Sequence, residues 1–299
     1  MKKFKSISLL TTLIVLIVVA IIGVYIYTSS DSYKAKQFYD MLGDDYTVSQ
    51  CDTIIEKFSN TEYAALAKQK KIDLIRQQND WAYISNKPTL ERLKRFKSHY
   101  HLSQKMANAV EEKIDSIVWE NALRGRTQKL YEEYVALGKM TRHHDEALIR
   151  LQDMLNLPNV QPLESSLKIN IDKFYDALSE RSKTSELIQL CADTIARFLF
   201  RHNITKDKLS SYIVNNYNKK IKKRIFNITS DIEFTKAYIS DGKVGYAALF
   251  DIEQGLPSKP LIKKRAMLIF TPEGKVAYMN MRRVYKKYNN QIITQTWKS

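Results

Sequence analysis

The chain has 299 residues, a formal net charge of +16 and a hydrophobic fraction of 44%. With 8 Gly and 6 Pro, this composition excludes a chain made largely of disordered linkers, and two cysteines exclude a disulfide framework. The basic excess lies in the last third, where 20 Lys or Arg stand against 7 Asp or Glu after position 200. This balance favours an anionic or acidic partner, although it also serves solubility alone.

An uncharged apolar run covers residues 7–27. At 1.5 Å per residue a helix of this length measures about 31 Å, which matches a hydrocarbon core of about 30 Å. A secretory signal has a shorter apolar run and small residues at its cleavage site, whereas Tyr25 and Tyr27 end this one. The run therefore predicts an uncleaved transmembrane anchor in contact with the lipid bilayer, with a cleaved signal peptide as the alternative.

The flanks of this run differ in charge. Three lysines precede it, whereas the sequence after it carries more acidic than basic residues, namely Asp31, Asp40, Asp44 and Asp45 against Lys34 and Lys36. Because basic flanks stay in the cytoplasm, residues 1–6 are predicted to be a cytoplasmic tail. We expect a single-pass inner (cytoplasmic) membrane protein with a periplasmic body, for which nucleic acid is an unlikely partner.

Residues 32–156 have helical periodicity throughout, with predicted helix starts at Ser32, at Thr47 and after Asn60. Trp81 and Trp119 lie 38 positions apart, and the same offset relates Phe96 to Tyr134. These paired helices resemble the tetratricopeptide-like superfamily. The resemblance implies a helical repeat that binds a protein partner, and the alternative is an irregular helical bundle without a groove.

The histidines and cysteines of the chain indicate no metal centre. His143 and His144 are adjacent, whereas two histidines on one helix face are three or four positions apart, so we expect them on a solvated helix surface. Cys51 and Cys191 lie in apolar helical patterns and are predicted to be two buried core residues, not a bridge. No metal ion or cofactor is predicted.

Two prolines at residues 157–164 indicate a linker between domains 32–156 and 165–299. Beyond it, helices are predicted from Ser165 or Ser166, over 184–199, and from Thr205 to Tyr217. The periodicity then changes from 3.6 to 2, which predicts strands over 226–239, 244–252, 264–270 and 276–284, with a turn at 271–274. Helices followed by an antiparallel sheet are typical of an α+β domain.

The segments 169–182, 240–252 and 265–284, in this order, resemble the nuclear transport factor 2-like family over 165–299. The resemblance implies a cone in which a curved sheet wraps a long helix, in a family that contains both enzymes and non-catalytic binding modules. No catalytic residue is predicted, because no acid and base are paired in the pattern. The weak candidates for a ligand site are Tyr246, Tyr278 and Glu233, and the tyrosines also fit a core.

Basic residues cluster around the predicted strands, and an antiparallel sheet brings some of them to one face. This basic patch comprises Lys219, Lys220, Lys222, Lys223, Arg224, Lys263, Lys264, Arg265, Arg282 and Arg283. It predicts an anionic lipid or an acidic partner, with a solvated surface as the alternative. The sequence thus favours a membrane-anchored, non-catalytic envelope scaffold or binding protein. The alternative is a tethered small-molecule-binding or enzymatic cone, of the isomerase or dehydratase kind.

Overall fold

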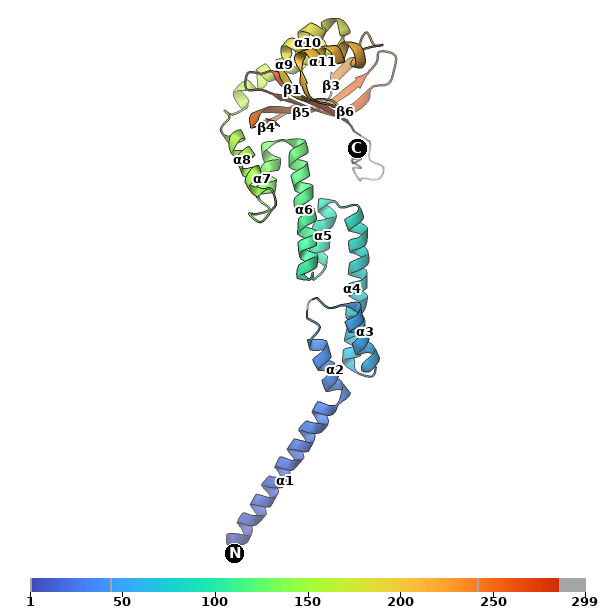
Figure 1. The fold of residues 1–299 in the computed structure, drawn as a ribbon, viewed down its shortest axis with the longest axis vertical. Coiled ribbons are helices and arrows are strands. Elements are labelled where there is room, and N and C mark those ends of the chain that lie inside the picture. The colour runs from blue at the N-terminus through green and yellow to red at the C-terminus, as the bar shows by residue number, and fades with distance from the viewer. Residues whose placement is uncertain (1, 44, 241, 285–299) are drawn as a thin grey trace. The chain divides into compact units, whose positions relative to one another are not determined.

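The computed structural model describes residues 2–43, 45–240 and 242–284 (Figure 1). Its contacts divide the chain into two compact units, Met1–Ile117 and Val118–Ser299. A helical N-terminal part precedes a part built of helices and a sheet, as predicted. The division falls between residues 117 and 118. Within the second unit, residues before and inside the predicted linker contact the same strand segment, because Lys236 Nζ donates to the carbonyl of Leu157 at 2.6 Å and Tyr238 N to that of Arg126 at 2.8 Å. That residues 157–164 link two domains that fold independently, 32–156 and 165–299, remains a prediction.

The first unit is helical in its described residues. Its elements are α1 Lys2–Ser29, α2 Asp31–Asp40, α3 Val48–Lys57, α4 Glu62–Asn86, α5 Leu90–His99 and the first part of α6 Gln104–Gly125. Among the described helices, α1 alone is long and apolar enough to cross a membrane, and none of its Thr12–Ser29 segment is buried. Elsewhere in the unit Cys51, Ile54 and Phe58 of α3 pack against Ala67 of α4.

Helix ends in this unit follow from side-chain caps. Thr47 begins α3 with a capping box, in which its hydroxyl accepts from Gln50 N and the Gln50 side chain accepts from Thr47 N at 2.8 Å. This confirms the predicted start at Thr47. Ser30, rather than the predicted Ser32, caps α2. Gly43 then adopts a positive φ of 56°, which favours glycine, and ends the turn after α2.

The second unit contains the sheet. Its helices are α7 Gln128–Val135, α8 His144–Leu155, α9 Glu164–Ser179, α10 Thr184–Leu190 and α11 Lys206–Tyr212, with 3₁₀ turns at Gln161–Leu163 and Arg181–Lys183 and a π-helical turn at Ile213–Tyr217. Its strands are β1 Thr194–Phe198, β2 Arg201–Thr205, β3 Ile225–Ile228, β4 Glu233–Ser240, β5 Lys243–Gly255, β6 Ile262–Phe270 and β7 Val276–Arg283.

The strand order is β2-β1-β7-β6-β5-β3, and β4 also pairs with β5. β5 is long enough to pair with β4 along its first half and with β3 along its second, so the predicted strand over 226–239 is two strands. The predicted helix over 184–199 is wrong. The helix ends at Leu190 because the following segment pairs with β7, where Ala192 N donates to Val276 O and Leu199 N to Met279 O, both at 2.9 Å.

Helices α9, α10 and α11 lie on one side of this sheet (Figure 1). Helix α9 buries Phe174 and Tyr175 against the inner face, where the Tyr175 ring centre lies 5.8 Å from that of Phe250. The opposite face carries a smaller cluster that includes Ala247 and Tyr278. Because alternate strand residues point to opposite faces, β5 supplies both clusters.

Gly245 is essential to the pairing of β5, because a Cβ at this position would lie 1.9 Å from the carbonyl oxygen of Phe270. We predict that Gly245→Ala lowers the free energy of unfolding by about 1–3 kcal/mol, since the strands must separate to admit the methyl group. Lys243→Ala, at an exposed position of the same strand, should change it by less than about 0.5 kcal/mol. Urea unfolding followed by circular dichroism measures both, and equal stabilities would contradict this packing.

Candidate functional site

The three residues proposed for a ligand site do not converge. Tyr246 and Tyr278 are each 1% exposed, but they belong to the clusters on opposite faces of the sheet. The Tyr246 hydroxyl donates to the carbonyl of Pro158 at 3.2 Å, and burial raises its pKa. Glu233 is exposed and lies 3.7 Å from the guanidinium of Arg265. The tyrosines therefore serve the core, in line with the second possibility that the sequence offered.

The sheet divides the predicted basic patch between its faces. Lys264 lies opposite Arg283 and Arg265 opposite Arg282, so each of these pairs occupies a different face. Arg265 is compensated by Asp251 at 3.2 Å, as is Lys263 at 3.1 Å. Although burial opposes ionisation of Asp251, hydrogen bonds from these two cations hold its pKa below the ordinary value.

Most of the patch residues in the segment before β3 are solvated. Lys219, Lys220, Lys222 and Lys223 are exposed, and Lys223 lies 3.4 Å from the carboxylate of Glu180. Arg224 differs because it is half-buried and its backbone N–H donates to the carbonyl of Ser179 at 2.8 Å, at the end of α9. This bond holds Arg224 on the inner side of the sheet.

Arg224 and Lys264 lie in one polar group, which we term the cationic cluster: Tyr217, Asn218, Arg224, Gln254 and Lys264. Lys264 Nζ donates to Gln254 Oε1 at 2.7 Å, and Gln254 Nε2 donates to the Tyr217 hydroxyl at 3.1 Å. The Arg224 guanidinium donates to Asn218 Oδ1 at 3.0 Å and lies 4.1 Å from the centre of the Tyr217 ring. Among the described residues no carboxylate pairs with Arg224 or Lys264.

The lack of a carboxylate beside Lys264 affects the pKa values in the cationic cluster. Burial lowers the pKa of Lys264, and the neighbouring cations Arg224 and Arg283 lower it further. Burial likewise raises the pKa of Tyr217 to about 12, opposed by Arg224. The phenol is therefore neutral at pH 7, while the ammonium is held in a place that disfavours its charge.

Two local features position the cationic cluster. The π-helical turn Ile213–Tyr217 ends with Asn218 N donating to Ile213 O at 2.8 Å, which turns Tyr217 and Asn218 toward Arg224. Gln254 continues the inner-face positions of β5 after Ile252. Arg224 and Lys264 belong to the basic patch predicted from the sequence, whereas Tyr217, Asn218 and Gln254 were not predicted. A glutamine in phase with apolar strand residues is the signal that identifies Gln254.

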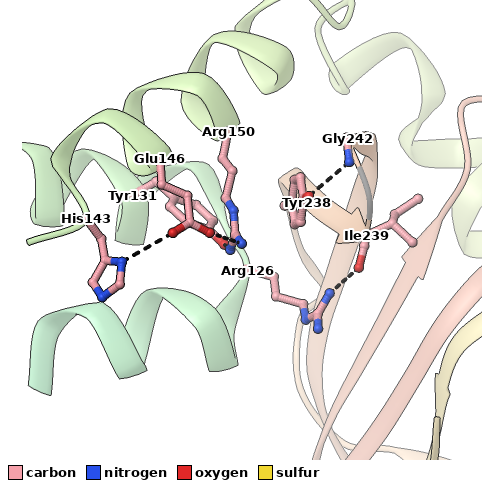
Figure 2. A network of polar contacts seen from close by, with 8 residues as sticks. All are labelled: Arg126, Tyr131, His143, Glu146, Arg150, Tyr238, Ile239 and Gly242. Carbon is pink, nitrogen blue, oxygen red and sulfur yellow. Dashed lines mark hydrogen bonds and ion pairs between the residues drawn. The ribbon is translucent and has the colours of Figure 1, made fainter. Parts of the chain in front are cut away.

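A second polar network joins helices α7 and α8 to β4 (Figure 2). Arg150 of α8 donates to the Tyr131 hydroxyl at 2.9 Å and pairs with Glu146, and its guanidinium lies 4.6 Å from the ring centre of Tyr238 on β4. Arg126 donates to the carbonyl of Ile239 on the same strand. Arg150 is paired with a carboxylate and Arg126 with a backbone carbonyl, and these contacts fasten the helices to the sheet edge.

His143 belongs to this region, contrary to the expectation of a solvated surface. Its ring stacks on Trp119 at 4.5 Å with an interplanar angle of 7°, and Nδ1 lies 3.3 Å from Glu146. Cys51 and Cys191 are free and buried, as predicted. In the part of the chain that the structure describes, no three His, Cys, Asp or Glu side chains are grouped to hold a metal ion.

A surface groove of about 550 Å³ lies between β2 and α11. Its lining includes Arg201, His202, Asp207 and Tyr212, and the Arg201 guanidinium lies 5.3 Å from the Tyr212 ring centre. The groove is separate from the cationic cluster in its lining residues.

A scan against protein-family models gives no match, and a search of the curated proteins gives none. Among solved structures, an NTF2-like protein of unknown function from Pseudomonas putida is similar at 12% identity over 46% of this chain and 98% of that one, with a TM-score of 0.34. An NTF2-like protein of unknown function from Exiguobacterium is 12% identical over 38% of this chain and 97% of that one, with a TM-score of 0.25. The Orange Carotenoid Protein of Anabaena binding canthaxanthin is 15% identical over 38% and 35%, with a TM-score of 0.27.

We predict that Arg150→Lys lowers the free energy of unfolding by about 2 kcal/mol. The ammonium of lysine keeps the charge but loses the planar contact with Tyr238 and the hydrogen bond to Tyr131. Arg95→Lys is the matched control, because Arg95 also pairs with a glutamate four positions earlier but is 77% exposed, and it should change stability by less than about 0.5 kcal/mol. Equal effects in chemical unfolding would show that the network does not fasten the helices.

Proposed function

We propose that the chain is a membrane-tethered, non-catalytic binding protein of the bacterial envelope. One observation carries the proposal: the apolar segment Thr12–Ser29 of α1 is exposed, with none of it buried against the protein. Leaving such a surface in water is unfavourable, whereas the hydrocarbon core of a bilayer accommodates it. The lysines before the run favour a cytoplasmic N-terminus and a periplasmic body.

The helical part supports a role in binding a protein partner. The ring centre of Trp81 lies 5.5 Å from that of Phe96, and the ring centre of Trp119 lies 4.9 Å from that of Tyr134. Residues 38 positions apart therefore make equivalent ring contacts. This recurrence supports a tetratricopeptide-like repeat over 32–156. Helix α4 exposes Leu66, Ile72 and Tyr83, and exposed apolar side chains are typical of protein-binding surfaces.

The helix-and-sheet part supports binding over catalysis. Its order of elements and the packing of α9 on the sheet favour a nuclear transport factor 2-like cone over 165–299. The inner face is filled by Phe174, Tyr175 and Phe250, and the Tyr246 hydroxyl is already bonded to backbone. A second candidate function, binding of a small molecule, is favoured by the groove between β2 and α11.

We expect the full chain to sediment with membranes and to resist alkaline carbonate. Replacing Leu16 and Val19 by arginine should release it, because each charge at the helix centre costs about 2.5–3.5 kcal/mol on insertion. The matched control places arginine at Ile149 and Ile169, which are 65% and 55% exposed outside α1 and should not change the fractionation. A wild-type chain in the soluble fraction would contradict the anchor.

The orientation has its own test. Protease added to spheroplasts should degrade the body of the chain, because the basic flank keeps only the N-terminal tail inside. A cytoplasmic protein serves as the control for spheroplast integrity. Full protection of the body from protease would reverse the proposed topology while leaving the anchor intact.

A further inference from the structure

We propose that Arg224, Lys264 and Arg283 form a binding site for a phosphate-type dianion, where β6 begins and β7 ends, on the α9 side of the sheet. The inference deepens the proposed function, on which it rests, by naming the ligand chemistry of its helix-and-sheet part. The phosphomonoester headgroup of phosphatidic acid and a soluble phosphate monoester share this chemistry.

The three cations converge from separate parts of the chain. Lys264 and Arg283 are opposite each other in the β6–β7 pairing and so share a face. Arg224 reaches the same place from the loop after the π-helical turn, through Tyr217, whose hydroxyl accepts from Gln254, the residue that also accepts from Lys264. The like charges of Arg224 and Lys264 repel each other at this place, and an anion between them relieves the repulsion.

Nearby carboxylates are engaged elsewhere. Glu180 pairs with Lys223, and Asp251 on the outer face pairs with Lys263 and Arg265. The carboxylates of the described residues therefore leave the charges of Arg224 and Lys264 uncompensated.

Donor atoms at the site also lack acceptors. Asn218 is 1% exposed, and its Nδ2 has no hydrogen-bond partner although its Oδ1 accepts from Arg224. Nη1 of Arg224 makes no hydrogen bond with a described residue, and the Lys264 ammonium uses one of its protons on Gln254. A buried donor without an acceptor is unfavourable, so a ligand that brings several oxygens is favoured.

The combination of charges selects the ligand class. Guanidinium and ammonium groups together match the oxygens of a phosphate or sulfate, and a dianion balances more of the clustered charge than a carboxylate does. Arg224 and Lys264 are half-buried while Arg283 is exposed, so the site opens to solvent on the side of β7. A phosphate group on a larger molecule enters from that side.

The test uses the full chain in nanodiscs of phosphatidylcholine, titrated with inorganic phosphate and with sulfate by calorimetry. We expect Lys264→Met and Arg224→Gln each to weaken phosphate binding by about tenfold or more, the effect of losing a charge-assisted hydrogen bond. Lys222→Gln is the matched control, because it removes one exposed charge from the same segment and should change the affinity by less than about twofold. Absence of phosphate binding by the wild type, or equal binding by the variants, would overturn the proposal.

Thermal unfolding distinguishes a loss of phosphate binding from a failure of the variant to fold. Lys264→Met removes a charge whose pKa is lowered by burial, so its melting temperature without phosphate should equal or exceed that of the wild type. Phosphate should raise the melting temperature of the wild type and of Lys222→Gln, but not that of Lys264→Met. A rise of the same size in both would overturn the site.

Vesicles separate the two sources of phosphate. If phosphatidic acid in phosphatidylcholine vesicles competes with inorganic phosphate for the wild-type chain, the headgroup is a ligand of the site. If free phosphate binds and these vesicles do not compete, the ligand is a soluble phosphate ester, and both results support the site. Fractionation with membranes is unaffected by these titrations, so failure of the anchor and failure of the site give different results.

Discussion

The packing of α9 on the inner face of the sheet is the interaction on which the rest of the second unit depends. Tyr175 contacts both Phe226 of β3 and Phe250 of β5, and so joins the helix to two strands that pair with each other. Because this interior is filled by rings, burial there disfavours any charge at its margin. That is why Lys264 and Tyr217 have shifted pKa values in opposite directions, and why each uses Gln254 as a hydrogen-bond partner.

The sheet also needs protection along β4, which pairs with β5 on one side only. The segment after α6 supplies it: Tyr238 N donates to the carbonyl of Arg126, and Thr127 forms a bridge with Ala237. Arg150 adds a planar cation against the Tyr238 ring. Covering an edge strand in this way removes a template for unwanted strand pairing. It also explains why α7 and α8 belong to the compact unit of the sheet, although their sequence is helical like that of the first unit.

The elements that follow local rules were predictable from the sequence. The capping box at Thr47 and the alternation along β5 are local patterns, and both give the observed elements. The failures involve partners distant in sequence: Ile195 continues a helical spacing from Cys191, yet its segment pairs with β7 about eighty positions later. The position of His143 was likewise not predicted, because its ring stacks on Trp119, a partner distant in sequence. For the cationic cluster, sequence identified two basic members, whereas Tyr217, Asn218 and Gln254 join it only through tertiary contacts.

The central claim is that the sheet holds an uncompensated positive charge beside a dry aromatic interior. Nuclear magnetic resonance of lysine side chains tests it most directly, with Lys264→Met identifying the Lys264 resonance in the full chain. The account predicts that the pKa of Lys264 lies below its ordinary value of 10.5 and rises toward that value when inorganic phosphate is added. A pKa at the ordinary value that does not respond to phosphate would contradict it.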